Sequence, residues 1–311
     1  MAQVPDRLLP RLGERGLASS DRGHLAASVV ASWAMFAAMV EPLDLDRVSR
    51  AKGLTAREVV IPLGAWPDNR PMDEVLDEAR RGVVGEHDQG ALVDEVRSAH
   101  AHESDRAIKD ALVRQCEQVE RLLYGDGLDE IADLPVASML GTLPLLSFVH
   151  AGTYPLATSA LDLEQAGAEV PQRLLDNGLL GLLDTIGALA ARQGVTASLA
   201  GVTPTTTVVT AAREGAWRTV DLVRLGEDPD GAAVGPAVRG TTRMLLDVTS
   251  GRADVPNAVR RKELGVDDWP GLLALTPIVD QVPGIPGRTA LAAAAKAAGA
   301  LSGAVRLFRR P

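Results

Sequence analysis

The sequence predicts a mostly α-helical protein that ends in a smaller α/β part and a helical tail. Apolar residues recur at helical spacing in several stretches between residues 23 and 192. Aromatic residues make up only 3% of the chain, so Leu, Val and Ala must fill the core, which suits closely packed helices. β-Branched residues concentrate instead between residues 203 and 225, which indicates strands.

Composition restricts the class of protein. A chain of 311 residues is long enough for about two domains, and its formal net charge of -9 argues against non-specific binding to nucleic acid. The single cysteine, Cys116, allows no internal disulfide, which fits a reducing cytoplasm. The N-terminus lacks a signal-peptide core, and Lys296 interrupts the only long apolar run near the C-terminus. We therefore expect a cytoplasmic protein that does not bind nucleic acid.

The first helices are delimited by prolines and by capping residues. Prolines near the start predict a flexible segment over residues 1–20, and a helix follows over 23–40. Thr55 and Glu58 have capping-box spacing and begin a short helix that runs into Pro62. An acidic helix is predicted over 72–81, then a loop, then a long helix over 104–124.

Two apolar helices follow. One is predicted from about 134 to 167, and in it Leu146 and His150 lie four residues apart on one face. The next, about 172–192, is apolar nearly all round, so it must be buried between domains or between subunits. If the helix is buried between subunits, the protein is expected to form a homodimer.

The C-terminal third changes character. Residues 203–213 and 217–225 read as a hairpin, and 241–248 as a short helix that ends at Gly251. In residues 288–311 there are five basic residues, no acidic residues and a regular apolar seam. This tail either docks on its own protein or frays, or it meets an anionic membrane surface or a protein partner, which would place the protein at the membrane periphery.

Three segments carry a resemblance to a known family. Residues 49–63, SRAKGLTAREVVIPL, resemble the first signature of the mycothiol-dependent maleylpyruvate isomerase family of the DinB-like superfamily. Residues 143–156 resemble its second signature, and residues 216–254 its C-terminal domain. After Asp254 the chain departs from the family, because residues 256–262 look helical where the family has a closing strand. The resemblance implies a DinB-like up-and-down four-helix bundle followed by a small α/β, sterol-carrier-like domain. The expected organisation is a flexible N-terminus (1–20), the bundle (21–170), an apolar connecting helix (171–200), the α/β domain (201–285) and a basic amphipathic tail (286–311).

The resemblance implies a metal site that this chain has lost. In the family a divalent metal is held by a His that ends the first signature, and by a Glu and a His in the second. Pro62, Leu146 and His150 occupy those positions here. One imidazole does not hold a catalytic divalent ion, so we expect no cofactor. Mycothiol or a metal would be used only if the family chemistry survived.

His150 therefore has three interpretations: a metal ligand, a residue that forms hydrogen bonds within the bundle, or a metal-free acid/base catalyst. The expected small-molecule pocket around it is apolar and comprises Trp33, Phe36, Pro62, Leu146 and Tyr154. Since the family's C-terminal domain supplies an anion-binding Arg, the candidates here are Arg239, Arg243 and Arg252, each also interpretable as a surface or ion-pair residue. His100 and His102, in the motif AHAHE, are predicted to be solvated at a helix N-terminus.

Three functions remain open from the sequence. The first is a divergent family member that binds a small molecule in the apolar pocket and catalyses a metal-free isomerisation or cyclisation. The second is a non-enzymatic scaffold that uses its tail to bind a membrane or a partner. The third is a mycothiol-dependent, metal-containing isomerase or thiol transferase.

Overall fold

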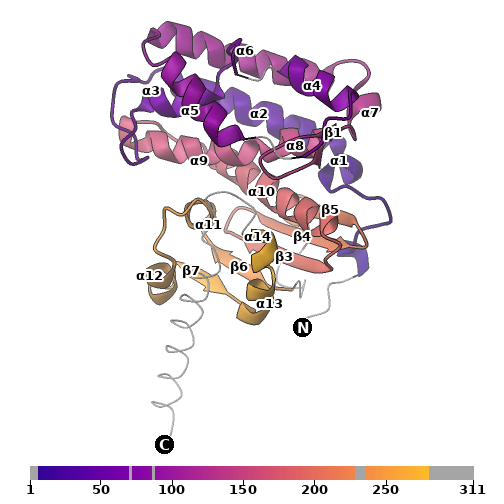
Figure 1. Ribbon diagram of the computed structural model, residues 1–311. Helices are drawn as coiled ribbons and strands as arrows, with labels where there is room; N and C mark the ends of the chain where they lie inside the picture. Colours follow the sequence, from indigo (N-terminus) through magenta and orange to yellow (C-terminus); the bar gives the residue numbers. More distant parts are fainter. Residues whose placement is uncertain (1–5, 70–71, 86–87, 228–234, 280–311) are drawn as a thin grey trace, which may run out of the picture. The chain divides into compact units, whose positions relative to one another are not determined.

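The computed structural model describes residues 6–69, 72–85, 88–227 and 235–279 (Figure 1). The chain divides into two compact units, which we call the helical unit (Leu17–Leu182) and the sheet unit (Met1–Gly16 with Leu183–Pro311). The prediction of a mostly helical protein with an α/β part is confirmed. The predicted basic tail, 286–311, lies outside the described residues, as do residues 1–5 of the predicted flexible N-terminus.

The helical unit is built around long helices joined by short elements. In chain order these elements are α1 (Leu17–Ser20), α2 (Arg22–Val40), α3 (Ala56–Val60), η2 (Ile61–Leu63), α4 (Met72–Arg80), α5 (Gln89–Ala99), α6 (Asp105–Tyr124), α7 (Leu128–Ile131), β1 (Pro135–Val136), β2 (Leu143–Pro144), α8 (Leu145–Ala151), α9 (Thr153–Leu163) and η3 (Glu164–Ala166). Helix α10 (Gln172–Arg192) begins in this unit and ends in the sheet unit.

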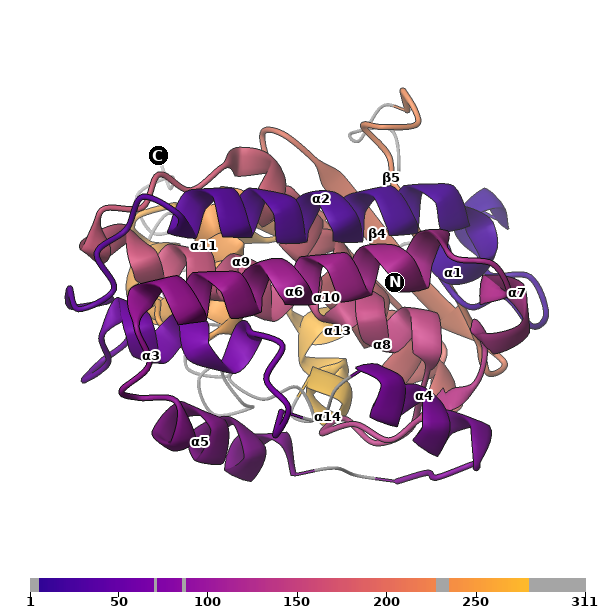
Figure 2. The same cartoon turned by 90° about the horizontal axis from the view of Figure 1, so that it is seen from above.

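Helices α2 and α6 run antiparallel, side by side (Figure 2). Near the start of α6, the Lys109 ammonium donates to the backbone carbonyls of Glu41 (2.7 Å) and Leu43 (2.9 Å), just beyond the end of α2. At the opposite ends, Arg22 forms an ion pair with Asp129. The Lys109 bonds satisfy carbonyls at and just beyond the end of α2, where a helix leaves such groups without intrahelical partners, and the ion pair links the start of α2 to α7.

A buried polar network joins α2, α9 and α10. The Asn177 side-chain amide donates to the Ser28 carbonyl (3.1 Å) and to Ser32 Oγ (2.9 Å). The Thr153 hydroxyl donates to the His150 carbonyl (2.8 Å) and lies 3.1 Å from the Asn177 carbonyl. Buried polar groups are tolerated when their hydrogen bonds are made, so this network specifies how the three helices pack.

The helix predicted over 134–167 is wrong in its extent. The chain first forms the small hairpin β1–β2, then α8, then α9. Pro144 would interrupt a helix that began before it, and in the structure it is the N-cap residue of α8. Gly141, in the loop of the hairpin, has a positive φ of 81°, a backbone conformation that glycine adopts readily. Leu146, His150 and Tyr154 thus lie on two short helices rather than on one long helix.

Residues 67–103 are more regular than predicted. The acidic helix is confirmed as α4, but the segment read as a loop contains α5. Asp88 caps α5 by accepting from the Ala91 amide at 3.0 Å. Among the described side chains of α5 only Val96 is buried, so the helix lacks the broad apolar stripe by which sequence patterns identify a helix.

The sheet unit holds a five-stranded sheet in the order β5-β4-β3-β6-β7. The β3–β6 pair is parallel, and the other pairs are antiparallel. The predicted hairpin is confirmed as β4–β5, whose two-residue loop, Glu214-Gly215, has positive φ at both positions. The elements are η1 (Asp6–Leu8), β3 (Ala197–Val202), β4 (Thr207–Arg213), β5 (Ala216–Asp221), β6 (Ala237–Gly240), α11 (Thr242–Thr249), α12 (Val255–Arg260), β7 (Leu264–Val266), α13 (Trp269–Ala274) and α14 (Thr276–Val279).

Two corrections concern the sheet unit. The predicted flexible segment 1–20 is structured from residue 6: Leu8 is buried in a core cluster with Val209 and Leu222, and the Gly16 amide donates to the Trp217 carbonyl at 2.8 Å. The prolines that stop a helix there do not prevent such packing and pairing. The predicted helix after residue 255 is confirmed as α12, but it does not replace the closing strand, since β7 follows it and pairs with β6.

Helices α2 and α10 are long and apolar enough to cross a bilayer by length and composition alone, as judged over the described residues. In each helix the most apolar stretch of 18 residues meets this criterion, and 50% of that stretch is buried in α2 and 94% in α10. Core helices of globular proteins satisfy the same criterion, and α10 is buried as such a helix is. The confirmed part of the prediction is therefore that α10 is a buried apolar helix.

Candidate functional site

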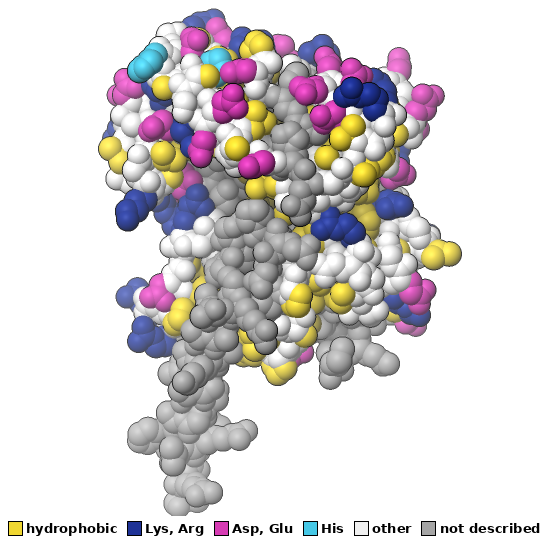
Figure 3. Space-filling view, viewed as in Figure 1, with side chains coloured by type: hydrophobic (Ala, Val, Ile, Leu, Met, Phe, Trp, Pro, Cys, Tyr) yellow, Lys and Arg dark blue, Asp and Glu magenta, His cyan; other side chains and the backbone are white. Residues whose placement is uncertain are grey.

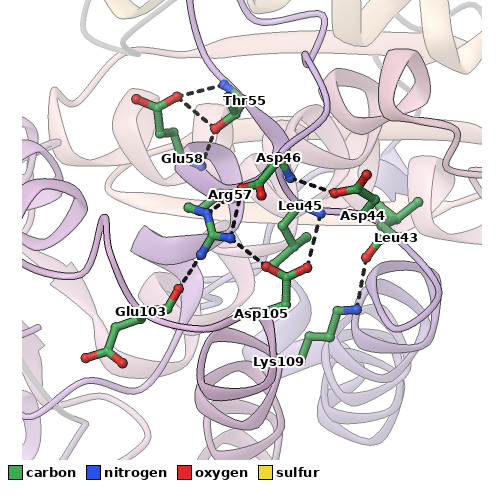
Figure 4. A network of polar contacts seen from close by, with 10 residues as sticks. All are labelled: Leu43, Asp44, Leu45, Asp46, Thr55, Arg57, Glu58, Glu103, Asp105 and Lys109. Carbon is green, nitrogen blue, oxygen red and sulfur yellow. Dashed lines mark hydrogen bonds and ion pairs between the residues drawn. The ribbon is translucent and has the colours of Figure 1, made fainter.

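The segment that resembles the first family signature is held by a polar network (Figure 4). Thr55 and Glu58 form the predicted capping box, with Glu58 Oε2 accepting from the Thr55 amide (2.7 Å) and hydroxyl (2.9 Å). The backbone hydrogen bond from Thr55, followed by the side-chain one, holds the pKa of Glu58 below its usual value. Arg57 pairs with Asp46 (2.8 Å) and Asp105 (2.6 Å). These residues of the signature therefore cap α3 and attach it to α6, which is a structural role.

Pro62, at the position of the first metal ligand in the resemblance, lies in η2. The backbone carbonyls around it accept side-chain hydrogen bonds: Trp66 Nε1 donates to Ile61 (2.7 Å), and Asn69 Nδ2 donates to Pro62 (3.1 Å) and Gly64 (3.0 Å). Pro62 itself offers no side-chain donor atom. The three side-chain hydrogen bonds therefore stabilise the turn that contains Pro62.

The second half of the predicted site is deeply buried. Leu146 and His150 on α8 are both 0% exposed, as is Phe36 on α2, while Trp33 on α2 is 9% exposed. Helix α2 packs against both α8 and α9. The fold thus gathers these four predicted residues on helices in mutual contact, and η2, which carries Pro62, packs against α3, α5 and α6.

Three polar side chains follow one face across α8 and α9. Ser147, His150 and Tyr154 are spaced by three and four residues, and Gly152 between the helices keeps right-handed helical angles (φ −60°, ψ −19°), so the face continues. Ser147 is 4% exposed, and the hydroxyl of the half-buried Tyr154 is itself buried. We call Ser147, His150 and Tyr154 the polar stripe. Ser147 was not predicted as a site residue, since a serine between apolar residues gives no sequence signal.

The donors at the predicted metal positions do not fit a divalent ion. Leu146 and Pro62 provide none, which leaves the His150 imidazole alone, whereas a catalytic site needs about three protein ligands. Among the described residues no three His, Cys, Asp or Glu side chains come together as a metal-binding group.

The three candidate arginines lie in the sheet unit. Arg239 on β6 donates from Nε to Asp267 at 2.8 Å, Arg243 is exposed on α11, and Arg252 is exposed in the turn after α11. The Arg239 contact matches the ion-pair interpretation. On the face shown in Figure 3, Lys and Arg side chains are interspersed with Asp and Glu.

His100 was predicted to lie at a helix N-terminus, but it is the C-cap residue of α5. Its ring stacks on Trp66, with centroids 3.9 Å apart and planes at 17°, and its Nε2 lies 2.8 Å from Asp68 Oδ1. The hydrogen bond to His100 holds the pKa of Asp68 below its usual value. The prediction missed this because it missed α5, which brings His100 back over the turn after η2.

Replacing His100 by alanine is expected to destabilise the helical unit by about 1–2 kcal/mol, since the ring stack and the bond to a carboxylate are both lost. His102→Ala, two residues further, is the matched control and should change stability by less than about 0.5 kcal/mol. Because the pKa of Asp68 is depressed in the folded protein, its contribution is present above the unfolded carboxyl pKa and is lost as pH falls through the folded value. Urea denaturation at pH 7 and at acid pH should show the His100→Ala effect shrinking at acid pH; equal effects of both variants would contradict it.

Cys116 is expected to be unreactive. Desolvation by burial raises the pKa of this half-buried thiol to about 11, against a usual 9.0, and Sγ lies 3.5 Å from the Trp33 carbonyl. At neutral pH the thiolate fraction is then about 100-fold lower than for a free cysteine, which slows alkylation correspondingly. The rate of reaction with iodoacetamide, followed by mass spectrometry from pH 7 to 10, should rise throughout; a plateau below pH 9 would show the expectation wrong.

The fold is that of a helical unit followed by a small α/β unit, and it has counterparts among solved structures. The crystal structure of a mycothiol-dependent maleylpyruvate isomerase matches with a TM-score of 0.51 and 12% identity, covering 88% of this chain and 99% of that one. A mutant of a mycothiol-dependent maleylpyruvate isomerase, with one histidine replaced by alanine, matches equally well. No family model matches the chain, and no curated protein matches it in sequence. The likeness therefore concerns the fold.

Proposed function

We propose that this chain is a divergent, metal-free protein of the maleylpyruvate isomerase fold, which binds a small molecule inside its helical unit. The observation that carries the proposal is the composition of α8 and α9. Where the resemblance places two metal ligands on this face, the chain has the fully buried pair Leu146 and His150. An interior that is apolar except for a few polar groups is typical of small-molecule sites.

His150 is the residue we assign to chemistry in this interior. An imidazole is the side chain whose unperturbed proton affinity suits proton transfer near neutral pH, so a bound molecule could be isomerised or cyclised by moving a proton at this ring, with the apolar walls fixing its shape. Trp33, Phe36, Leu146 and Tyr154 are the neighbouring residues that we assign to binding, with Pro62 at the edge of the unit.

Metal analysis tests the first half of the proposal. The purified protein should contain no stoichiometric divalent ion, and it should not convert maleylpyruvate when mycothiol and zinc are added. A stoichiometric ion that disappears in His150→Gln, together with mycothiol-dependent turnover, would overturn the metal-free proposal in favour of the family chemistry.

Binding of a small apolar probe tests the second half. Benzene at millimolar concentration should raise the unfolding temperature and shift backbone amide resonances, with the largest shifts on α2, α8 and α9. His150→Gln serves as a companion variant, which should leave benzene binding in place because benzene makes no hydrogen bond. Shifts scattered over the surface, or none at all, would contradict a binding site inside the helical unit.

A further inference from the structure

We propose that the ligand is an uncharged molecule with one hydrogen-bonding group, such as a hydroxyl or carbonyl, and that the Ser147 hydroxyl is its anchor. This inference rests on the proposed function and specifies its ligand class. Ser147 lies at the third position of α8 and is 4% exposed. Its Oγ is buried and has no hydrogen-bond partner among the described residues.

The local backbone explains why Ser147 is left without a partner. A serine within a helix usually donates to the carbonyl three or four residues earlier, as Ser32 does to Ser28 (2.7 Å) and Ser28 does to Leu25 (2.9 Å) on α2. Four residues before Ser147 the chain is in β2, at Leu143, so no helical carbonyl is stacked beneath the hydroxyl. A buried hydroxyl without a partner is costly, which means that a bound group is favoured at this position.

The position of Ser147 places that bound group beside His150. Ser147 and His150 are three positions apart on α8, and Tyr154 on α9 is four positions further, so the polar stripe places a hydroxyl, an imidazole and a phenol along one face. A ligand whose single polar group meets Ser147 therefore has its next atoms near the imidazole that we assign to proton transfer.

The charge of the surroundings selects an uncharged ligand. From residue 134 to residue 161 the sequence contains no Asp, Glu, Lys or Arg. Leu146 and Phe36, both 0% exposed, add apolar surface. An ion transferred into such an interior without a partner charge would lose its hydration uncompensated, whereas a neutral polar group needs only one hydrogen bond.

Phenol and benzene, which differ by one hydroxyl, form the probe pair for this inference. Wild-type protein should bind phenol more tightly than benzene, as measured by calorimetric titration. Ser147→Ala should weaken phenol binding by about 3- to 10-fold, the loss of one hydrogen bond, and leave benzene binding unchanged. Ser28→Ala is the matched control, because its hydroxyl is buried but already bonded within α2, and it should leave both affinities unchanged.

The outcomes separate the inference from the function on which it rests. If both probes bind inside the helical unit but Ser147→Ala binds phenol as wild type does, the anchor is overturned and the proposed function stands. If neither probe binds, both fail. In the absence of ligand, Ser147→Ala should unfold at the same or a higher urea concentration than wild type, whereas Ser28→Ala should unfold at a lower one. A Ser147→Ala midpoint as low as that of Ser28→Ala would show that the hydroxyl already has a partner, and would overturn the inference.

Discussion

Leu146→Glu is expected to destabilise the protein by about 3–5 kcal/mol at neutral pH, because it places an unpaired carboxylate at a fully buried position. The position is in the first turn of α8, where the helix dipole favours negative charge, but that effect is only about 0.3–1 kcal/mol and does not offset the burial. Leu146→Met is the control and should cost less than about 1.5 kcal/mol.

The same variant tests the reading of the metal site. Burial disfavours the charged form, so the carboxyl pKa should be raised in the folded state, and the destabilisation should be small at acid pH and grow above the unfolded carboxyl pKa of about 4.3. Guanidinium denaturation at pH 4 and pH 7 measures this difference. Zinc titration should show no tight site, since the new carboxylate and His150 supply only two donors and Pro62 none. Tight zinc binding by this single variant would contradict the metal-free proposal.

The second large effect is expected at two glycines of α10. A Cβ at Gly181 would lie 2.1 Å from Thr153 Oγ1 and 2.7 Å from the His150 carbonyl, and one at Gly178 would lie 2.3 Å from the Ala157 Cβ. These overlaps involve backbone or short side chains, so α9 and α10 would have to separate. Alanine at either position should therefore cost about 1–3 kcal/mol, and more at Gly181, where the hydrogen bonds of Thr153 are also displaced.

The matched control is Gly23→Ala, the same substitution in a helix. Gly23 is exposed on α2, and an added Cβ would have only Asp21 near it, at 4.0 Å, so alanine should stabilise by about 0.5–1 kcal/mol. The free energies of unfolding from urea curves, read from a probe in the helical unit, give the comparison. Wild-type stability for Gly181→Ala would show that α9 and α10 are not in such close contact.

Both predictions concern the same region, because α8, α9 and the first half of α10 form the surroundings of the polar stripe. The backbone carbonyl of His150 is held by Thr153, whose partner Asn177 is held in turn by α2. The backbone that carries the His150 imidazole is thus held by a network that reaches α2, α9 and α10.

The sequence predicted features that depend on local chemistry. The capping box at Thr55, the bounds of α6 and α10 and the β4–β5 hairpin follow from caps, helical spacing and a two-residue loop, which are settled within a few residues. The absence of donors at Pro62 and Leu146 is likewise a property of the sequence, as is the lack of formal charge on the face of α8.

The tertiary structure alone decided what each polar side chain meets. Helix α5 has one described buried residue, Val96, and only a narrow apolar stripe, so its packing against η2 is what shows that it forms and that it brings His100 onto Trp66. Ser147 lacks the usual helical acceptor because the chain four residues before it lies in β2 and not in a helix. Hydrogen-bond satisfaction depends on residues distant in sequence, and for that reason the sequence located His150 while the fold was needed to identify Ser147 beside it.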